Sequence, residues 1–161
     1  MPALFTRLSR RRELLRIPAH LLQEAVAEGW SKWPLETGGI LLGKPGPDGH
    51  VVTDLIGPGP EGRHERYGFT PDSDWQAEQV AARWATDSNL HYLGDWHTHP
   101  GGSTRLSRLD RSTARDIAAY EEARQPNPFM LVLALGRDQT VRVGAARLIN
   151  DRLRRVVVHP H

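Results

Sequence analysis

The chain has 161 residues, of which 39% are apolar and 25% charged, with a formal net charge of +2. These values are typical of one compact domain, and the longest apolar runs, MLVLAL and GGILLG, are far shorter than the roughly 20 residues that cross a bilayer. The sequence contains no cysteine, which excludes disulfide scaffolds, cysteine-based zinc fingers, thiol proteases and thiol redox motifs. Any bound metal must therefore have His, Asp or Glu ligands.

The first 12 residues are rich in arginine and form a candidate basic arm, and we expect a single domain over residues 13–161. The N-terminal residues lack the apolar stretch of about 7–15 residues found in export signals, so we expect a cytoplasmic protein. A second arginine group lies near the C-terminus. A solvated basic surface explains both groups as well as nucleic-acid binding does, so no nucleic-acid partner is expected; the arginines are Arg7, Arg10, Arg11, Arg12, Arg152, Arg154 and Arg155.

The first half of the chain predicts a strand, a helix and a hairpin. Residues 13–17 read as a strand, and Pro18 suits the first turn of a helix. That helix has apolar residues at steps of three or four, namely Leu22, Val26, Trp30 and Trp33. Two β-like runs, GGILLG and HVVTDLIG, then flank a turn that contains Pro47, Asp48 and Gly49, which predicts a hairpin.

The second half predicts two more helices and the rest of a sheet. Ser73 and Gln76 have capping-box spacing before an apolar stripe of Ala77, Val80, Ala81 and Trp84. HYLGDWHTH reads as a strand, a third helix is predicted from about Ser107 to Arg124, and three further strands follow in PFMLVLALG, TVRVGAARLI and RRVVVH. This order predicts a mixed sheet packed between helices, in the α/β class, with α+β as the alternative.

One apparent nucleotide motif fails on inspection. GPGPEG at residues 57–62 matches GxGxxG, but two of its variable positions are prolines, which have no N–H to offer a pyrophosphate. The following RHERYGF predicts no helix that could cap a phosphate. The segment is therefore interpreted as a turn.

The segment GDWHTHPGGSTRLSRLD carries the strongest chemical pattern. His97 and His99 are two residues apart, so on a strand both imidazoles point to one face and can bind one ion. Asp110 lies in register with Thr113, Ala114 and Ile117 on the less polar face of the third helix, where an inward carboxylate needs a partner. Two His and one Asp leave a tetrahedral zinc one open position for water.

Ser107 and Asp110 also have the SxxD spacing of a helix start. In isolation this spacing favours a plain N-cap with an acidic residue that complements the helix dipole. The complete pattern, in which seven residues separate an HxH pair from an SxxD pair, is more specific than HxH or SxxD alone.

That combination resembles the JAMM (MPN-plus) metalloprotease family, whose signature is an upstream Glu followed by H[ST]HPx(6)SxxD. ETGGILLG resembles the family's ExxGxLxG segment and makes Glu36 the counterpart of its catalytic Glu. YLGDWHTHP is similar to the prokaryotic branch, and the resemblance extends from about Leu14 to Leu148. It implies a JAMM/MPN-like curved mixed sheet flanked by helices. Leu106 stands where many relatives have Pro, which should affect the shape of the loop rather than the chemistry.

The resemblance implies a role for each residue. His97, His99 and Asp110 would bind Zn²⁺, which lowers the pKa of a bound water toward about 7. Glu36 would take a proton from that water as general base, and Ser107 would donate a hydrogen bond to the developing oxyanion. Asp95 is a candidate partner of a zinc histidine, although a surface acid is the simpler interpretation.

The residues and the resemblance together predict a zinc-dependent isopeptidase or peptidase. The resemblance alone implies the substrate: cleavage after the C-terminal Gly of a ubiquitin-like protein, in deconjugation or precursor processing. The resemblance further implies partners: the ubiquitin-like protein with its Gly-Gly tail, its conjugates, and activating-like and conjugating-like enzymes of the same operon. The loops after Gly57 and Asp110 are short, so a linkage-selective deubiquitinase is not expected. Two alternatives stay open: a non-enzymatic MPN-type interaction domain, and a nucleic-acid-associated accessory protein of a mobile element.

Overall fold

A computed structural model describes residues 12–161. The predicted basic arm therefore lies almost entirely outside the described residues. Along the chain the elements are β1 (Leu14–Ile17), α1 (Ala19–Lys32), β2 (Gly38–Gly46), β3 (Gly49–Ile56), β4 (Arg63–Glu65), β5 (Gly68–Thr70), α2 (Ser73–Thr86), β6 (His91–Pro100), α3 (Arg108–Ala119), the 3-10 helix η1 (Glu121–Ala123), β7 (Phe129–Leu135), β8 (Val141–Ile149) and β9 (Arg152–Pro160). Among these described residues, no helix is both long and apolar enough to span a membrane.

Seven strands form one curved mixed sheet in the order β1-β3-β2-β6-β7-β8-β9, and β1 also pairs with β9, which closes the sheet. The pairs β1–β3, β1–β9 and β6–β7 are parallel, and the others are antiparallel. Register shifts in the β2–β3 and β2–β6 pairs bend these strands, because a bulge increases local twist. The predicted α/β class with a curved mixed sheet flanked by helices is confirmed.

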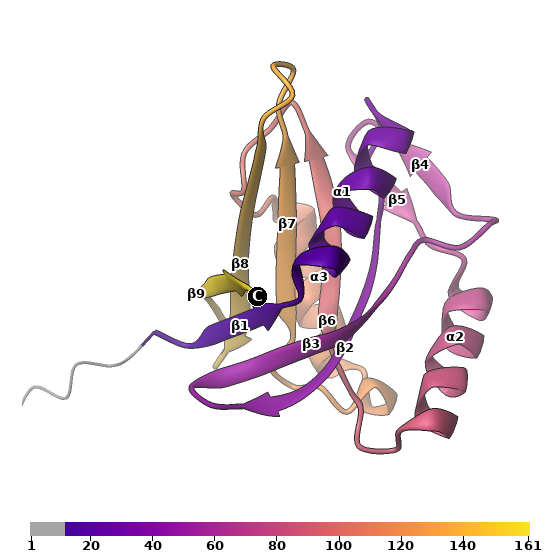
Figure 1. Ribbon diagram of the computed structural model, residues 1–161, viewed down its shortest axis with the longest axis vertical. Helices are drawn as coiled ribbons and strands as arrows, with labels where there is room; N and C mark the ends of the chain where they lie inside the picture. Colours follow the sequence, from indigo (N-terminus) through magenta and orange to yellow (C-terminus); the bar gives the residue numbers. More distant parts are fainter. Residues whose placement is uncertain (1–11) are drawn as a thin grey trace, which may run out of the picture.

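Helices α1 and α3 cover opposite faces of this sheet, whereas α2 stands at its side (Figure 1). Alternate residues of β7 explain the arrangement. Phe129, Leu131 and Leu133 belong to the main core with Leu21 and Leu22 of α1, while Met130 packs under Ala114 of α3. Because both faces of β7 are covered, its sequence is an unbroken apolar run.

The predicted hairpin of β2 and β3 is confirmed, and the segment after GPGPEG forms the small β4–β5 hairpin rather than a helix. Helix α1 follows Pro18 as predicted but ends at Lys32, so Trp33 is its C-cap residue. The third helix is shorter than predicted. It stops at Ala119 because Tyr120 adopts an extended conformation, with φ −82° and ψ 101°.

The prediction for α2 was wrong in two details. Its N-cap is Asp72, whose carboxylate accepts a hydrogen bond from the Trp75 N–H at 3.1 Å, rather than Ser73. The residue that faces the protein is Gln76, which is 5% exposed and donates to the Gly57 carbonyl at 2.8 Å. The predicted stripe of Ala77, Ala81 and Trp84 is exposed instead, because polar contacts hold this helix to its neighbours.

Candidate metal centre

Strand β6 brings the two predicted histidines together. The Nε2 atoms of His97 and His99 lie 2.9 Å apart, because alternate residues of a strand point to the same side. Thr98 points the other way and is fully buried. Its Oγ1 accepts a hydrogen bond from the Thr37 N–H at 3.0 Å, and its own N–H donates to the Thr37 carbonyl at 2.8 Å. These bonds fix the end of β6 against the start of β2.

The first turn of α3 supplies the carboxylate. Asp110 Oδ1 lies 3.1 Å from His97 Nε2, and Asp110 Oδ2 lies 3.3 Å from His99 Nε2. Asp110 is only 8% exposed, and the N–H of Ser107 donates to its Oδ2 at 2.6 Å. In return, the Asp110 N–H donates to Ser107 Oγ at 3.1 Å. The capping box that starts the helix thus also orients this carboxylate toward the histidines.

A further hydrogen bond sets the tautomer of His99. Its Nδ1 donates to the carbonyl oxygen of Ser103 at 2.7 Å, which leaves Nε2 as the nitrogen with a free lone pair. Metal-binding histidines characteristically have such a partner on the second nitrogen. The sequence pattern did not identify Ser103, because any residue type can provide a backbone carbonyl.

The electrostatics of the three groups are those of a cation site. Burial opposes ionisation of Asp110, but hydrogen bonds from His97 and His99 outweigh it and hold the pKa of Asp110 well below its usual range. Burial likewise lowers the pKa of His99, but the hydrogen bonds to Asp110 and Ser103 outweigh it, so the pKa of His99 is raised.

The donor atoms of His97, His99 and Asp110 all lie within 4.8 Å of one another. Two imidazole nitrogens and a carboxylate oxygen match the protein ligands of a catalytic divalent metal site. These residues therefore fit a metal.

Glu36 precedes β2 beside this cluster. Its N–H donates to the Glu65 carbonyl at 2.8 Å, and its own carbonyl accepts from His64 Nδ1 at 3.0 Å, so the β4–β5 hairpin fixes its backbone. Burial raises the pKa of Glu36, while His97 and His99 lower it and Asp110 raises it further. The net upward shift moves this carboxyl toward the pH range in which a general base works well. The contribution of His64 was not predicted, because this contact joins residues that are 28 positions apart in the sequence.

Glu36, His97 and Asp110 share a cleft of about 220 Å³ between the β4–β5 hairpin and α3. Its apolar lining includes Phe69 and Leu109. A Cβ atom built on Gly68 would lie 3.7 Å from Leu109 Cδ2, so the hairpin and the helix almost touch here. The cleft is therefore narrow next to the candidate metal ligands.

Asp95 is not the surface acid that the sequence favoured. It lines the same cleft, is partly buried, and accepts a hydrogen bond from the Tyr92 hydroxyl at 2.6 Å. Burial raises the pKa of Asp95 to about 6, against the lowering effects of Tyr92 and His97. The expectation was wrong because the strand turns this side chain toward α3 rather than toward solvent.

Comparison with known proteins agrees with a metal-dependent site. Residues 18–147 match the family of prokaryotic homologues of the JAB domain. A probable metalloprotease, y4qB of Sinorhizobium fredii, is 35% identical over 128 residues, which cover 77% of each chain. The CD-NTase/cGAS isopeptidase of Enterobacter hormaechei is 29% identical over 119 residues, or 73% of this chain and 65% of that protein. The enzyme of the same name from Pseudomonas aeruginosa is 30% identical over 98 residues, 60% of this chain and 62% of its own length.

The fold also has a solved counterpart. The solution structure of protein DSY2949 from Desulfitobacterium hafniense superimposes with a TM-score of 0.65 and covers 91% of this chain and 92% of its own. At 17% identity, this likeness concerns the fold alone. The family match, together with the metalloprotease relative, identifies the chain as a hydrolase: it belongs to the prokaryotic JAB family and is a metalloprotease of that family.

Proposed function

We propose that the chain is a zinc-dependent isopeptidase or peptidase that cleaves after the C-terminal Gly of a ubiquitin-like protein. The observation that carries the proposal is the convergence of His97, His99 and Asp110 at a narrow cleft, which His97 and Asp110 line together with Glu36. The metalloprotease domain is proposed to occupy residues 13–161, with residues 1–12 as a basic arm. Two relatives are named isopeptidases, which supports a protein conjugate as the substrate.

His97, His99 and Asp110 would hold the zinc ion, which when bound supplies an acidified water and a polarised scissile carbonyl. Glu36 would accept the proton of that water at its carboxylate and deliver it to the leaving amine. The hairpin that holds its backbone and the Thr37–Thr98 bonds keep this carboxylate in the cleft.

Ser107 would stabilise the oxyanion. Its Oγ already accepts a hydrogen bond from Asp110 N–H, but accepting uses a lone pair and leaves the hydroxyl hydrogen free to donate. The side chain is exposed beside the ligands. The N-cap role and the catalytic role are therefore compatible in one residue.

The cleft favours an extended tail of small residues. Among the described residues, β5 pairs with β4 alone, so its outer edge is available for backbone hydrogen bonds with a substrate strand. Gly68 and Leu109 leave little width between the hairpin and α3. Glycines before the scissile bond would let the substrate backbone pass through. Activating-like and conjugating-like enzymes of the same operon are the proposed partners.

The test uses fusions of a ubiquitin-like protein to an unrelated peptide, with Gly-Gly or Ala-Ala at the junction. With zinc, the enzyme is expected to cut after Gly-Gly only, with the product masses measured by mass spectrometry. The Glu36→Gln variant should leave both fusions intact and thus excludes a contaminating protease. Equal cleavage of both junctions, or no cleavage by the zinc-loaded enzyme, would contradict the proposed substrate.

A further inference from the structure

A second hollow lies next to α3, on the side away from the Glu36 cleft. It has a volume of about 550 Å³ and is lined by the 104–106 loop, α3, β7, β8, β9 and Arg12, two residues before β1. Met130 lines both this hollow and the cleft, so the two adjoin under the first turns of α3. We call it the arginine groove, after Arg12, Arg105, Arg111 and Arg155.

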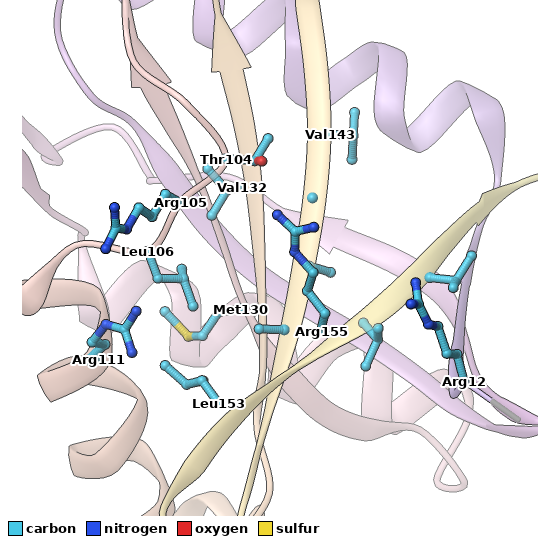
Figure 2. Close-up of a pocket in the computed structure, with 15 residues that line it drawn as sticks. Arg12, Thr104, Arg105, Leu106, Arg111, Met130, Val132, Val143, Leu153 and Arg155 are labelled. Atoms are coloured by element: carbon cyan, nitrogen blue, oxygen red, sulfur yellow. The ribbon is translucent and has the colours of Figure 1, made fainter. Parts of the chain in front are cut away.

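The four arginines surround an apolar floor (Figure 2). Arg105 and Arg111 lie on one side of Leu106, Met130 and Leu153, and Arg155 and Arg12 lie on the other. The pairing of β1 with β9 explains this meeting, because it brings residue 12 and residue 155 from the two ends of the chain to one surface. One arginine of each group, Arg12 from the N-terminal group and Arg155 from the C-terminal group, thus lines this groove.

The groove has an uncompensated positive charge. None of its lining residues is acidic, and all four arginines are exposed. Within residues 12–161, none of the four guanidinium groups has an ion pair or hydrogen bond, whereas Arg115 is paired with Asp151 and Arg147 with Glu13. Guanidinium groups without protein acids nearby attract carboxylates or phosphates from a ligand.

The floor favours a peptide over a nucleic acid. Its side chains are aliphatic or Met, and no lining residue has an aromatic ring on which a base could stack. An extended acidic peptide with alternating apolar residues matches both features, since its carboxylates reach the rim and its apolar side chains cover the floor.

The position of the groove relates it to the candidate metal centre. Its wall includes Thr104, Arg105 and Leu106, the residues that connect Ser103, the partner of His99, with Ser107. Arg111 directly follows Asp110. A substrate tail placed in the Glu36 cleft, as the proposed function has it, would approach the ligands from one side of α3, and the residues beyond the scissile bond would then leave toward the arginine groove on the other side.

We propose that the arginine groove binds an acidic segment of the protein that is attached beyond the scissile bond. The assignment of the groove to the leaving side of the substrate rests on the proposed function. The binding of an acidic peptide in the groove does not. Selectivity on the leaving side would then come from charge in a groove rather than from an inserted loop.

Binding is tested with the zinc-loaded Glu36→Gln protein and a labelled peptide in which glutamates alternate with leucines and valines. Fluorescence anisotropy should show saturable binding that weakens with salt, and a peptide with glutamines in place of glutamates should bind about tenfold more weakly or worse. The groove variant Arg111→Glu/Arg155→Glu should lose about tenfold or more in affinity for the acidic peptide. The matched control Arg152→Glu/Arg154→Glu, which changes the same number of charges outside the groove, should lose about twofold or less. Unchanged melting temperatures establish that both variants fold.

Equal binding of the two peptides, or equal weakening in both double variants, would overturn the proposal. Tighter binding of an oligothymidine than of the acidic peptide would also overturn it and make the groove a nucleic-acid surface.

The leaving-side position is tested with Gly-Gly fusions in which the segment after the scissile bond contains either glutamates or glutamines. Wild type should cleave the glutamate fusion with a higher kcat/KM than the glutamine fusion. The groove variant should cleave the two fusions with equal kcat/KM. Wild type could bind the acidic peptide, and the groove variant could lose that binding, while no fusion is cleaved. That result would support the groove as a peptide-binding site and contradict the proposed substrate.

Discussion

Helices α2 and α3 begin alike but differ in what their first turns do. In α2, Asp72 caps the Trp75 N–H from a partly buried position, and the helix contacts the protein through Gln76. In α3, Ser107 caps Asp110, and Asp110 is buried against two histidines. The same local signal therefore stabilises a helix in one place and orients a candidate metal ligand in the other. The surroundings of the acidic residue, rather than the capping pattern, determine which applies.

The largest effect is expected from removing the buried carboxylate of Asp110, because the carboxylate at the start of α2 contacts no candidate metal ligand. Asp110→Ala should lower cleavage of the Gly-Gly fusion about a thousandfold or more, because the metal contributes several kcal/mol to the reaction. The matched change Asp72→Ala removes a cap without touching the site and should lower unfolding free energy by about 1 kcal/mol while activity is retained. Kinetic assays and thermal melts measure both. Equal losses of activity would remove the distinction between the helices.

Glu36→Gln should reduce turnover on the order of a hundred- to ten-thousandfold, since it removes a general base but keeps the shape of the side chain. Metal content and melting temperature should stay close to wild type, because Glu36 is assigned to the proton and not to the ion. Near-normal turnover in this variant would disprove the assigned role.

Ser107→Ala removes a cap and an oxyanion donor together. We expect kcat to fall about a hundredfold and unfolding free energy to fall by about 1 kcal/mol. Asp72→Ala serves as the reference for the cap alone. If the two variants lose the same stability and neither loses activity, Ser107 is a cap and nothing more.

The smallest of these effects is on the pH dependence of metal binding. Because Asp110 and Ser103 raise the pKa of His99 above its ordinary 6.5, protons begin to compete for its Nε2 above that pH as the solution is acidified. Apparent zinc affinity, measured by chelator competition from alkaline to mildly acidic pH, should fall about tenfold per pH unit once His99 protonates. Affinity that stays constant through this range would show that His99 is not a ligand.

The sequence predicted most of the strands and the grouping of the candidate metal ligands, because both depend on local spacing. The HxH pattern needs only a strand, and the inward face of Asp110 needs only a helix, since Ala114 and Ile117 share it. Closure of the sheet could not be predicted from any local pattern, because it pairs Leu14 with Val157. The exposed apolar side of α2 was missed because a buried Gln76, held by the Gly57 carbonyl, determines which face packs.

Parts of the site depend on contacts across the sheet and were not predictable either. The Thr37–Thr98 bonds join residues that are 61 positions apart, and His64 holds the backbone of Glu36 from a separate hairpin. One rim of the arginine groove likewise depends on the β1–β9 pair, which brings Arg12 and Arg155 to one surface.

The most direct test of the metal centre is the zinc content of three proteins purified without chelator and measured side by side by elemental analysis. Wild type and Asp72→Ala should each hold about one zinc per chain, and Asp110→Ala less than about a tenth, because a ligand is lost from only one of the two helix starts. Full zinc in Asp110→Ala, or none in wild type even after zinc is added, would contradict a metal centre at His97, His99 and Asp110.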